Sequence, residues 1–269
     1  RRWVGVLPSP DPYREPDFRG EDAGRHYGDA ARIVVAGRDR PPAGLIADAL
    51  PGCAGQVVPA PGVMAAAYQA VREAGGLVIA DEVQTGFGRV GDTFWAFGLH
   101  SVVPDVVTMG KPIGNGHPLG AVVTTRAIAE AFNNGMEYFN TFGGNPVSAA
   151  VGNAVLDVIE DDGLQANAAA VGRVLLDGLL DLAADHDAIG DVRGAGLFVG
   201  VELVTNRTTA QPHPELAARV VERAREAGVL LSTDGPHDNV IKIKPPLVFT
   251  PDHALRLVAV LGEHLGALG

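Results

Sequence analysis

Two short runs, each placed after an apolar stretch, supply an acid and an amine that suit one kind of cofactor. Asp81 follows the apolar residues 77–80, and Lys111 follows the apolar residues 106–108 after a short turn. Side chains at the carboxyl ends of neighbouring strands face the crevice where open α/β sheets bind ligands. Pyridoxal phosphate needs such a pair, because a carboxylate keeps its ring nitrogen protonated and an amine bonds to its aldehyde. We therefore expect Asp81 and Lys111 to be the catalytic pair of a pyridoxal-phosphate enzyme.

Nearby residues offer further contacts for the same cofactor. Val83 is placed to pack on the ring face, and Gln84 to hydrogen-bond the ring oxygen. We expect the amine of Lys111 to be desolvated, which would lower its pKa and make it a better nucleophile. Thr141 precedes two glycines and a helix start, a combination that can receive a phosphate oxygen. The alternatives are a strand-end aspartate that caps a loop, a surface lysine and an ordinary capped helix.

The elements that position these residues alternate between short apolar strands and helices. Such alternation predicts an α/β fold with a mostly parallel sheet, and a smaller α+β domain follows it. We place the domains at residues 1–160 and 161–269. The expected strands are 45–47, 77–80, 102–108, 119–124, 197–203, 229–231 and 240–243. The expected helices are 21–35, 63–74, 126–132, 146–159, 164–184, 215–227 and 252–265.

Composition excludes several classes of partner. The 269 residues carry a formal net charge of −11, which disfavours nucleic acid and anionic membrane surfaces. No apolar run approaches the ~20 residues that a membrane-spanning helix needs. The single cysteine, Cys53, excludes an internal disulfide and predicts a reducing, cytoplasmic environment. The eight histidines lack metal-binding spacing, so no metal site is expected.

Three runs carry a resemblance to a known family. They are DEVQTGFGR at 81–89, MGK at 109–111 and TFGGNP at 141–146. Together they resemble the class III aminotransferases, pyridoxal-phosphate enzymes of fold type I. The resemblance covers nearly the whole chain, from about Trp3 to Leu265.

This resemblance implies a role for each residue of the site. Asp81 would pair with the pyridinium nitrogen, Gln84 with the ring oxygen, and Val83 would stack on the ring. Lys111 would be the Schiff-base lysine. In the family, the threonine that matches Thr141 reaches the cofactor phosphate of the neighbouring subunit, so a homodimer is implied.

Within the family, runs 135–141 and 231–246 are similar to ethanolamine-phosphate phospho-lyases and their alanine–glyoxylate aminotransferase 2-like relatives. Many other members have an arginine where Lys242 stands, and some pair it with a glutamate where Cys53 stands. An arginine grips a carboxylate with two parallel hydrogen bonds, whereas a lysine is a point charge. We therefore expect Lys242 and Cys53 to contact a phosphoamine without an α-carboxylate. The alternative is that Lys242 and Lys244 are solubilising lysines on an edge strand.

We therefore expect a phospho-lyase that eliminates phosphate from a phosphoamine such as ethanolamine phosphate. The alternatives are a transaminase of the ω-amine or alanine–glyoxylate type, and a catalytically silent fragment or domain of a multidomain protein. The family's Ser/Gly-rich phosphate loop lies upstream of the segment seen here. The resemblance therefore implies the C-terminal part of a longer enzyme, with exposed strand edges.

Overall fold

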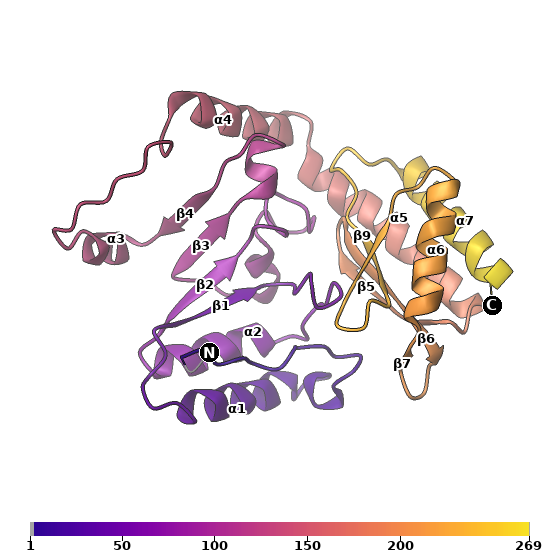
Figure 1. Ribbon diagram of the computed structural model, residues 1–269, viewed down its shortest axis with the longest axis horizontal. Coiled ribbons are helices and arrows are strands. Elements are labelled where there is room, and N and C mark those ends of the chain that lie inside the picture. Colours follow the sequence, from indigo (N-terminus) through magenta and orange to yellow (C-terminus); the bar gives the residue numbers. More distant parts are fainter. Residues whose placement is uncertain (1–2, 269) are drawn as a thin grey trace.

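A computed structural model describes residues 3–268, which form two β-sheets with helices packed against them (Figure 1). Residues 1, 2 and 269, at the ends of the two expected domains, lie outside the described part. The strands are β1 (Gly44–Asp48), β2 (Leu77–Asp81), β3 (Val106–Met109), β4 (Ala121–Thr124), β5 (Ile189–Ala195), β6 (Phe198–Asn206), β7 (Gln211–Pro212), β8 (Ser232–Asp234) and β9 (Val240–Ile243). The α-helices are α1 (Ala23–Ala36), α2 (Val63–Glu73), α3 (Arg126–Phe132), α4 (Pro146–Asp161), α5 (Leu164–Asp185), α6 (Pro214–Glu226) and α7 (Pro251–Leu268).

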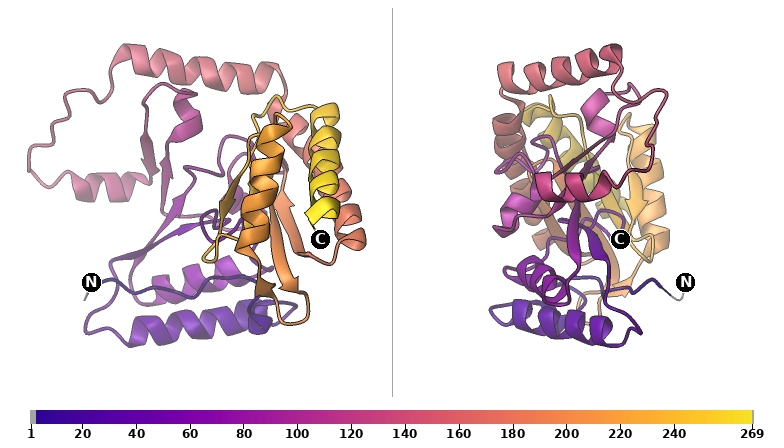
Figure 2. Two further views of the ribbon diagram at one scale, coloured as in Figure 1. Left: turned by 45° about the vertical axis from the view of Figure 1, so that its right-hand side comes forward. Right: turned by 90° about the vertical axis from the view of Figure 1, so that its left-hand side faces the viewer.

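The first sheet has the order β1-β2-β3-β4. β1, β2 and β3 are parallel, and β4 pairs with β3 in the antiparallel direction. Met64 and Tyr68 of α2 pack on Val78 of β2, and α1 lies in turn against α2 (Figure 2). Apolar side chains on alternate strand positions thus bury one face of this sheet. The mostly parallel sheet expected from the sequence is confirmed.

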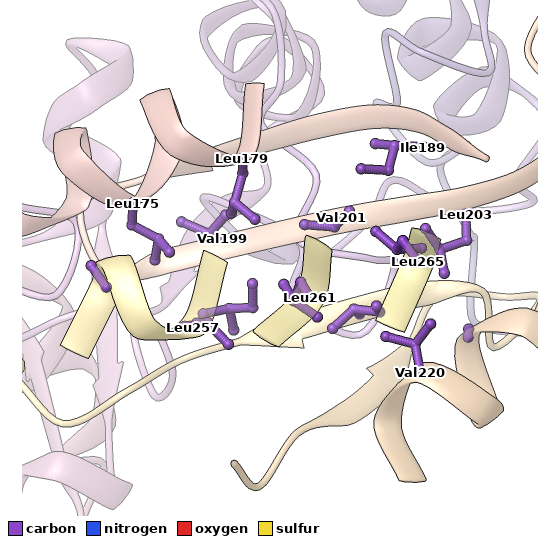
Figure 3. Packing of buried hydrophobic residues seen from close by; sticks show 14 of the residues in the cluster. Leu175, Leu179, Ile189, Val199, Val201, Leu203, Val220, Leu257, Leu261 and Leu265 are labelled. Atoms are coloured by element: carbon purple, nitrogen blue, oxygen red, sulfur yellow. The ribbon is translucent and has the colours of Figure 1, made fainter. Parts of the chain in front are cut away.

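The second sheet is antiparallel, with the order β5-β6-β9-β8 and with β7 paired to β6. One apolar cluster joins it to α5, α6 and α7 (Figure 3). Leu175 and Leu179 of α5, Val201 of β6 and Leu257 and Leu261 of α7 are all buried in this cluster. Apolar residues at helical spacing on α5 and α7 supply the stripe that packs on the sheet. The expected α+β part is confirmed.

Two predicted strands differ from the structure, and two observed strands, β5 and the two-residue β7, were not predicted. Residues 229–231 are not a strand, and Leu230 is 84% exposed; β8 begins one residue later. Residues 102–105 are irregular, because Pro104 lacks the N–H that a central strand must donate. β5 was not predicted, because Gly190, Asp191 and Gly194 break its apolar pattern.

The two sheets meet at a small apolar contact. Phe198, the first residue of β6, packs against Ala49 and Leu50, which follow β1. Within the described residues, β1 and β4 are the outer strands of the first sheet. The domain boundary near residue 160 stays a prediction; α4 ends at Asp161 and α5 begins at Leu164.

Candidate active site

The site is built on the carboxyl ends of three neighbouring strands. Asp81 ends β2, with Asp48 of β1 and Thr108 of β3 directly opposite it in the parallel register. Partners in a parallel register project from the same face of the sheet. The Asp81 carboxylate accepts a hydrogen bond from the Val83 backbone N–H at 3.0 Å. This bond fixes the direction in which the chain leaves β2.

The pKa of Asp48 depends on the charged groups around it. Burial and the neighbouring carboxylate of Asp81 raise the pKa of Asp48, while Lys111 and Lys244 act in the opposite direction. Two carboxylates and two ammonium groups therefore lie within electrostatic reach of one another. The sequence prediction that Asp81 and Lys111 share one end of the sheet agrees with this arrangement.

Lys111 has an unusual backbone. It opens a short 3-10 turn, Lys111–Gly114, directly after Gly110, and its φ is +39°. A non-glycine residue in this left-handed region is strained, and such strain is concentrated at functional sites. Val83 lies beside the same turn, since a Cβ placed on Gly110 would meet a Val83 methyl group at 3.5 Å. The Lys111 residue is exposed in the described structure, so the expected desolvation of its amine is not seen there.

Gln84 connects the two sheets. Its Oε1 accepts a hydrogen bond of 2.7 Å from the Lys244 Nζ, just beyond β9. Its Nε2 lies 3.8 Å from the Cys53 Sγ, a long contact to a weak acceptor. Cys53 is a free, exposed thiol. Gln84 and Cys53 thus lie close together, and Lys244 is a contact that sequence reasoning missed.

Lys242 occupies a different environment from its neighbour Lys244. Its Nζ lies 3.1 Å from the Asp234 carboxylate, and both side chains are largely buried. The alternative reading of these lysines as part of an edge strand is wrong, because β9 lies between β6 and β8. Lys242 and Lys244 are two positions apart, so the sequence could have indicated Lys244 as a candidate site residue together with Lys242.

Thr141 lies apart from this cluster. It is exposed, on the segment 133–145 that leads from α3 to α4 and projects away from the body (Figure 1). The first turn of α4 is capped by Asn145, whose side chain accepts the Ser148 N–H at 2.8 Å. Thr141 therefore has no role within the Asp81–Lys111 cluster of the same chain.

A second polar group missed from the sequence is buried behind the site. The Arg193 guanidinium donates to the Gly55 carbonyl at 2.8 Å and to Glu202 at 2.7 Å. Glu202 also contacts Arg14, from the segment before α1. Burial opposes the charge of Arg193, but Glu202 and Asp191 outweigh it and raise its pKa. The network ties the loop that carries Cys53 to the second sheet.

Glu82, next to Asp81, points away from the site. It is fully buried and accepts backbone N–H bonds from Ala96 at 3.0 Å and Phe97 at 2.9 Å. Asp81 and Glu82 therefore do not form a carboxylate pair, because neighbouring residues of an extended chain project in opposite directions. Among residues 3–268, no group of histidine, cysteine, aspartate or glutamate side chains is placed to hold a metal ion.

The residues at this strand end fit pyridoxal phosphate. Two polar atoms there lack strong partners: the buried Thr108 Oγ1 has none in the described structure, and the Gln84 Nε2 has only the long Cys53 contact. Asp81 offers an anion for a protonated ring nitrogen, and the exposed amine of Lys111 is accessible to an aldehyde. An acid, an amine and an unsatisfied amide donor in one place are the groups this cofactor requires.

The mixed sheet and the helices packed on it match the architecture of fold type I, the fold of pyridoxal-phosphate-dependent aminotransferases. The family model described as Aminotransferase class-III matches residues 6–265. The chain therefore belongs to the class III aminotransferase family, whose members depend on pyridoxal phosphate.

Individual relatives agree with this assignment. The chain is 48% identical to an alanine–glyoxylate aminotransferase 2-like protein of Drosophila melanogaster, over 99% of this chain and 56% of the relative. It is 42% identical to ethanolamine-phosphate phospho-lyase homolog 1 of Caenorhabditis elegans, over 98% of this chain and 60% of the relative. A solved phospholyase from Arthrobacter, in complex with phosphoethanolamine, superposes with a TM-score of 0.89 at 38% identity, over 99% of this chain and 63% of that one. The chain thus spans little more than half the length of the curated relatives it matches.

No helix in the described part of the chain is both long and apolar enough to cross a membrane.

Proposed function

We propose that the complete protein is a pyridoxal-phosphate-dependent phospho-lyase that eliminates phosphate from a phosphoamine such as ethanolamine phosphate. The observation that carries this proposal is the clustering of Asp81, Gln84 and Lys111 at the carboxyl ends of β2 and β3. The similarity to a phospholyase that binds phosphoethanolamine supports the choice of substrate.

Four residues would hold the cofactor. Lys111 would bond to its aldehyde, Asp81 would face its ring nitrogen, Gln84 would donate to its ring oxygen and Val83 would lie against its ring. When bound, the cofactor supplies an electron-withdrawing ring that stabilises negative charge on the substrate carbon. The negative charge of Asp81 favours the protonated ring nitrogen on which this electron withdrawal depends.

Lys111 would also move the proton. With substrate bound, the free amine of Lys111 would be a general base for the proton on the substrate carbon that carries the amine. The bond from the adjacent carbon to the phosphate oxygen then breaks, and phosphate leaves. Water completes the balance, so that the products are phosphate, ammonia and an aldehyde.

The substrate end of the site supports a substrate without an α-carboxylate. Lys242 is already paired with Asp234, and Cys53 offers no charge partner such as a glutamate would provide. A carboxylate-gripping arginine fork is thus replaced by a compact, neutralised ammonium. We propose that Lys242 and Cys53 contact the substrate and favour a phosphoamine over an amino acid.

A transaminase is the second candidate, favoured by the identity to the alanine–glyoxylate aminotransferase 2-like relative. It would use the same Asp81 and Lys111, with Lys111 acting as both the general base and the general acid, and no phosphate would be released. A catalytically silent domain is the third candidate, in which Lys111 would hold no cofactor.

We further propose a homodimer in which Thr141 reaches the cofactor phosphate of the other subunit. The exposure of Thr141 on a projecting segment supports this role, because a residue that serves another subunit must be accessible to it. Cytoplasm remains our proposed compartment, from the single reduced cysteine.

The complete protein, incubated with ethanolamine phosphate, tests these candidates. Release of phosphate and aldehyde supports the lyase. Turnover of an amino donor with glyoxylate or pyruvate, without release of phosphate, rejects the lyase and supports the transaminase. If the parent protein and Lys111→Ala show the same absorbance, no cofactor is bound through Lys111. That result would support the silent domain.

A further inference from the structure

Lys244 is the cation that contacts the predicted cofactor site, although it belongs to the second sheet. It lies just beyond β9, with its Nζ 2.7 Å from the Gln84 Oε1. The same Nζ lies 5.1 Å from the centre of the Phe198 ring, which holds the ammonium in place through a cation–π contact. Phe198 is fully buried, so this support is rigid.

The chemistry of the ammonium decides how the Gln84 amide is oriented. A lysine ammonium has three donors and no acceptor, so only the oxygen of an amide can face it. The Nε2 of Gln84 must therefore point the other way, where its contact is the Cys53 Sγ at 3.8 Å. Because a thiol is a weak acceptor, this nitrogen keeps a donor hydrogen for a stronger one.

The ring oxygen of pyridoxal phosphate is such an acceptor, and a reversed amide would present an oxygen to it instead of a donor. We propose that Lys244 is a positioning residue, whose ammonium fixes the orientation of the Gln84 amide so that its NH2 group faces the cofactor oxygen. The cofactor part of this inference rests on the proposed function, whereas the Lys244–Gln84 contact does not depend on it.

Lys242 provides a matched comparison. It is separated from Lys244 by one residue and has the same charge, but its Nζ is bonded to Asp234 rather than to Gln84. A general effect of positive charge on cofactor affinity would appear in variants of both lysines. A positioning effect would appear in variants of Lys244 alone.

The first experiment measures cofactor affinity by titrating the complete apoprotein with pyridoxal phosphate. We expect Lys244→Met to weaken binding about tenfold, because a hydrogen bond to a charged group is lost and the amide is free to rotate. Lys244→Arg keeps a donor and should restore most of the affinity. Lys242→Met, at a residue proposed to contact the substrate and not the cofactor, should show no comparable loss of affinity for pyridoxal phosphate. Equal losses in Lys242→Met and Lys244→Met, or no loss in either, would overturn the proposal.

The second experiment needs no cofactor. The side-chain NH2 resonances of Gln84, assigned through their loss in Gln84→Glu, are recorded in glutamine-labelled apoprotein. We expect them to move in Lys244→Met and to stay in place in Lys242→Met. Unchanged resonances in Lys244→Met would refute the contact, whatever the cofactor does. If the parent protein binds no cofactor through Lys111, the proposed function fails, and these resonances still decide the role of Lys244.

Discussion

Removing Arg193 should be among the most destabilising single changes in the chain. Its guanidinium donates to Gly55, Asp191 and Glu202 at 2.7–2.8 Å, and its side chain is only 7% exposed. Glu202 is 1% exposed, so Arg193→Met leaves its carboxylate buried with Arg14 and Asn239 as remaining partners. Breaking one side of a buried ion pair costs about 3–5 kcal/mol of unfolding free energy.

A double variant separates the stabilisation by the Arg193–Glu202 ion pair from the cost of leaving one buried charge without its partner. Glu202→Leu combined with Arg193→Met removes both charges, and Arg14, 21% exposed, can still reach water. We expect the double variant to lose about 2 kcal/mol less than the sum of the two single losses, since contacting residues couple by up to about 3 kcal/mol.

Urea unfolding, followed by tryptophan fluorescence, measures each free energy. Arg223→Met is the control, because Arg223 and Glu226 form a pair on an exposed helix face, and such a pair is worth about 0–1 kcal/mol. If Arg193→Met loses no more stability than this control, or if the double variant loses the full sum, the buried network does not hold the loop as described.

Three further changes test other parts of the structure. Gly172→Ala should cost about 1–3 kcal/mol of unfolding free energy, because the new Cβ would overlap the Gly196 carbonyl oxygen. Gly266→Ala, in an open helical position, should gain up to about 1 kcal/mol. Urea unfolding of both variants checks this, and equal effects would contradict the contact. Glu82→Gln should lose about 1–3 kcal/mol in the same assay, because one amide oxygen cannot replace a carboxylate that accepts two backbone N–H bonds; a neutral result would show that the bonds carry no stability. Burial and a neighbouring carboxylate raise the pKa of Asp48 in the folded state. Asp48 therefore contributes to the unfolding free energy at low pH, where it is protonated, and this contribution is lost as the pH rises through the raised pKa. Unfolding free energy should therefore fall less between pH 4 and pH 7 in Asp48→Asn than in the parent chain, and parallel curves would exclude the shift.

The local pattern of apolar runs, glycines and prolines was sufficient to predict most of the strands and helices. The apolar runs before Asp81 and Lys111 are short and bounded by glycine or proline, so strands were predicted there and the strand-end rule brought the two residues together. Residues 229–231 show the limit of predicting strands from short apolar runs. Their apolar side chains suit a strand, but the backbone pairs only from Ser232 onward.

Long-range contacts could not be predicted in this way. Gln84 and Lys244 are 160 positions apart, and nothing local to either residue indicates that they are bonded. The same holds for Arg193 and Gly55, which meet only because β5 packs beside the loop after β1. The exposure of Lys111 is likewise a property of the assembled sheet, not of its neighbours in sequence.

The position of Phe198 has a mechanical consequence. It and Lys244 move with the second sheet, whereas Leu50 and Gln84 move with the first. Rotation of one sheet against the other would shear the aromatic contact and the ammonium–amide bond in the same motion. The Lys244–Gln84 bond and the contact of Phe198 with Leu50 therefore both depend on the same relative placement of the two sheets.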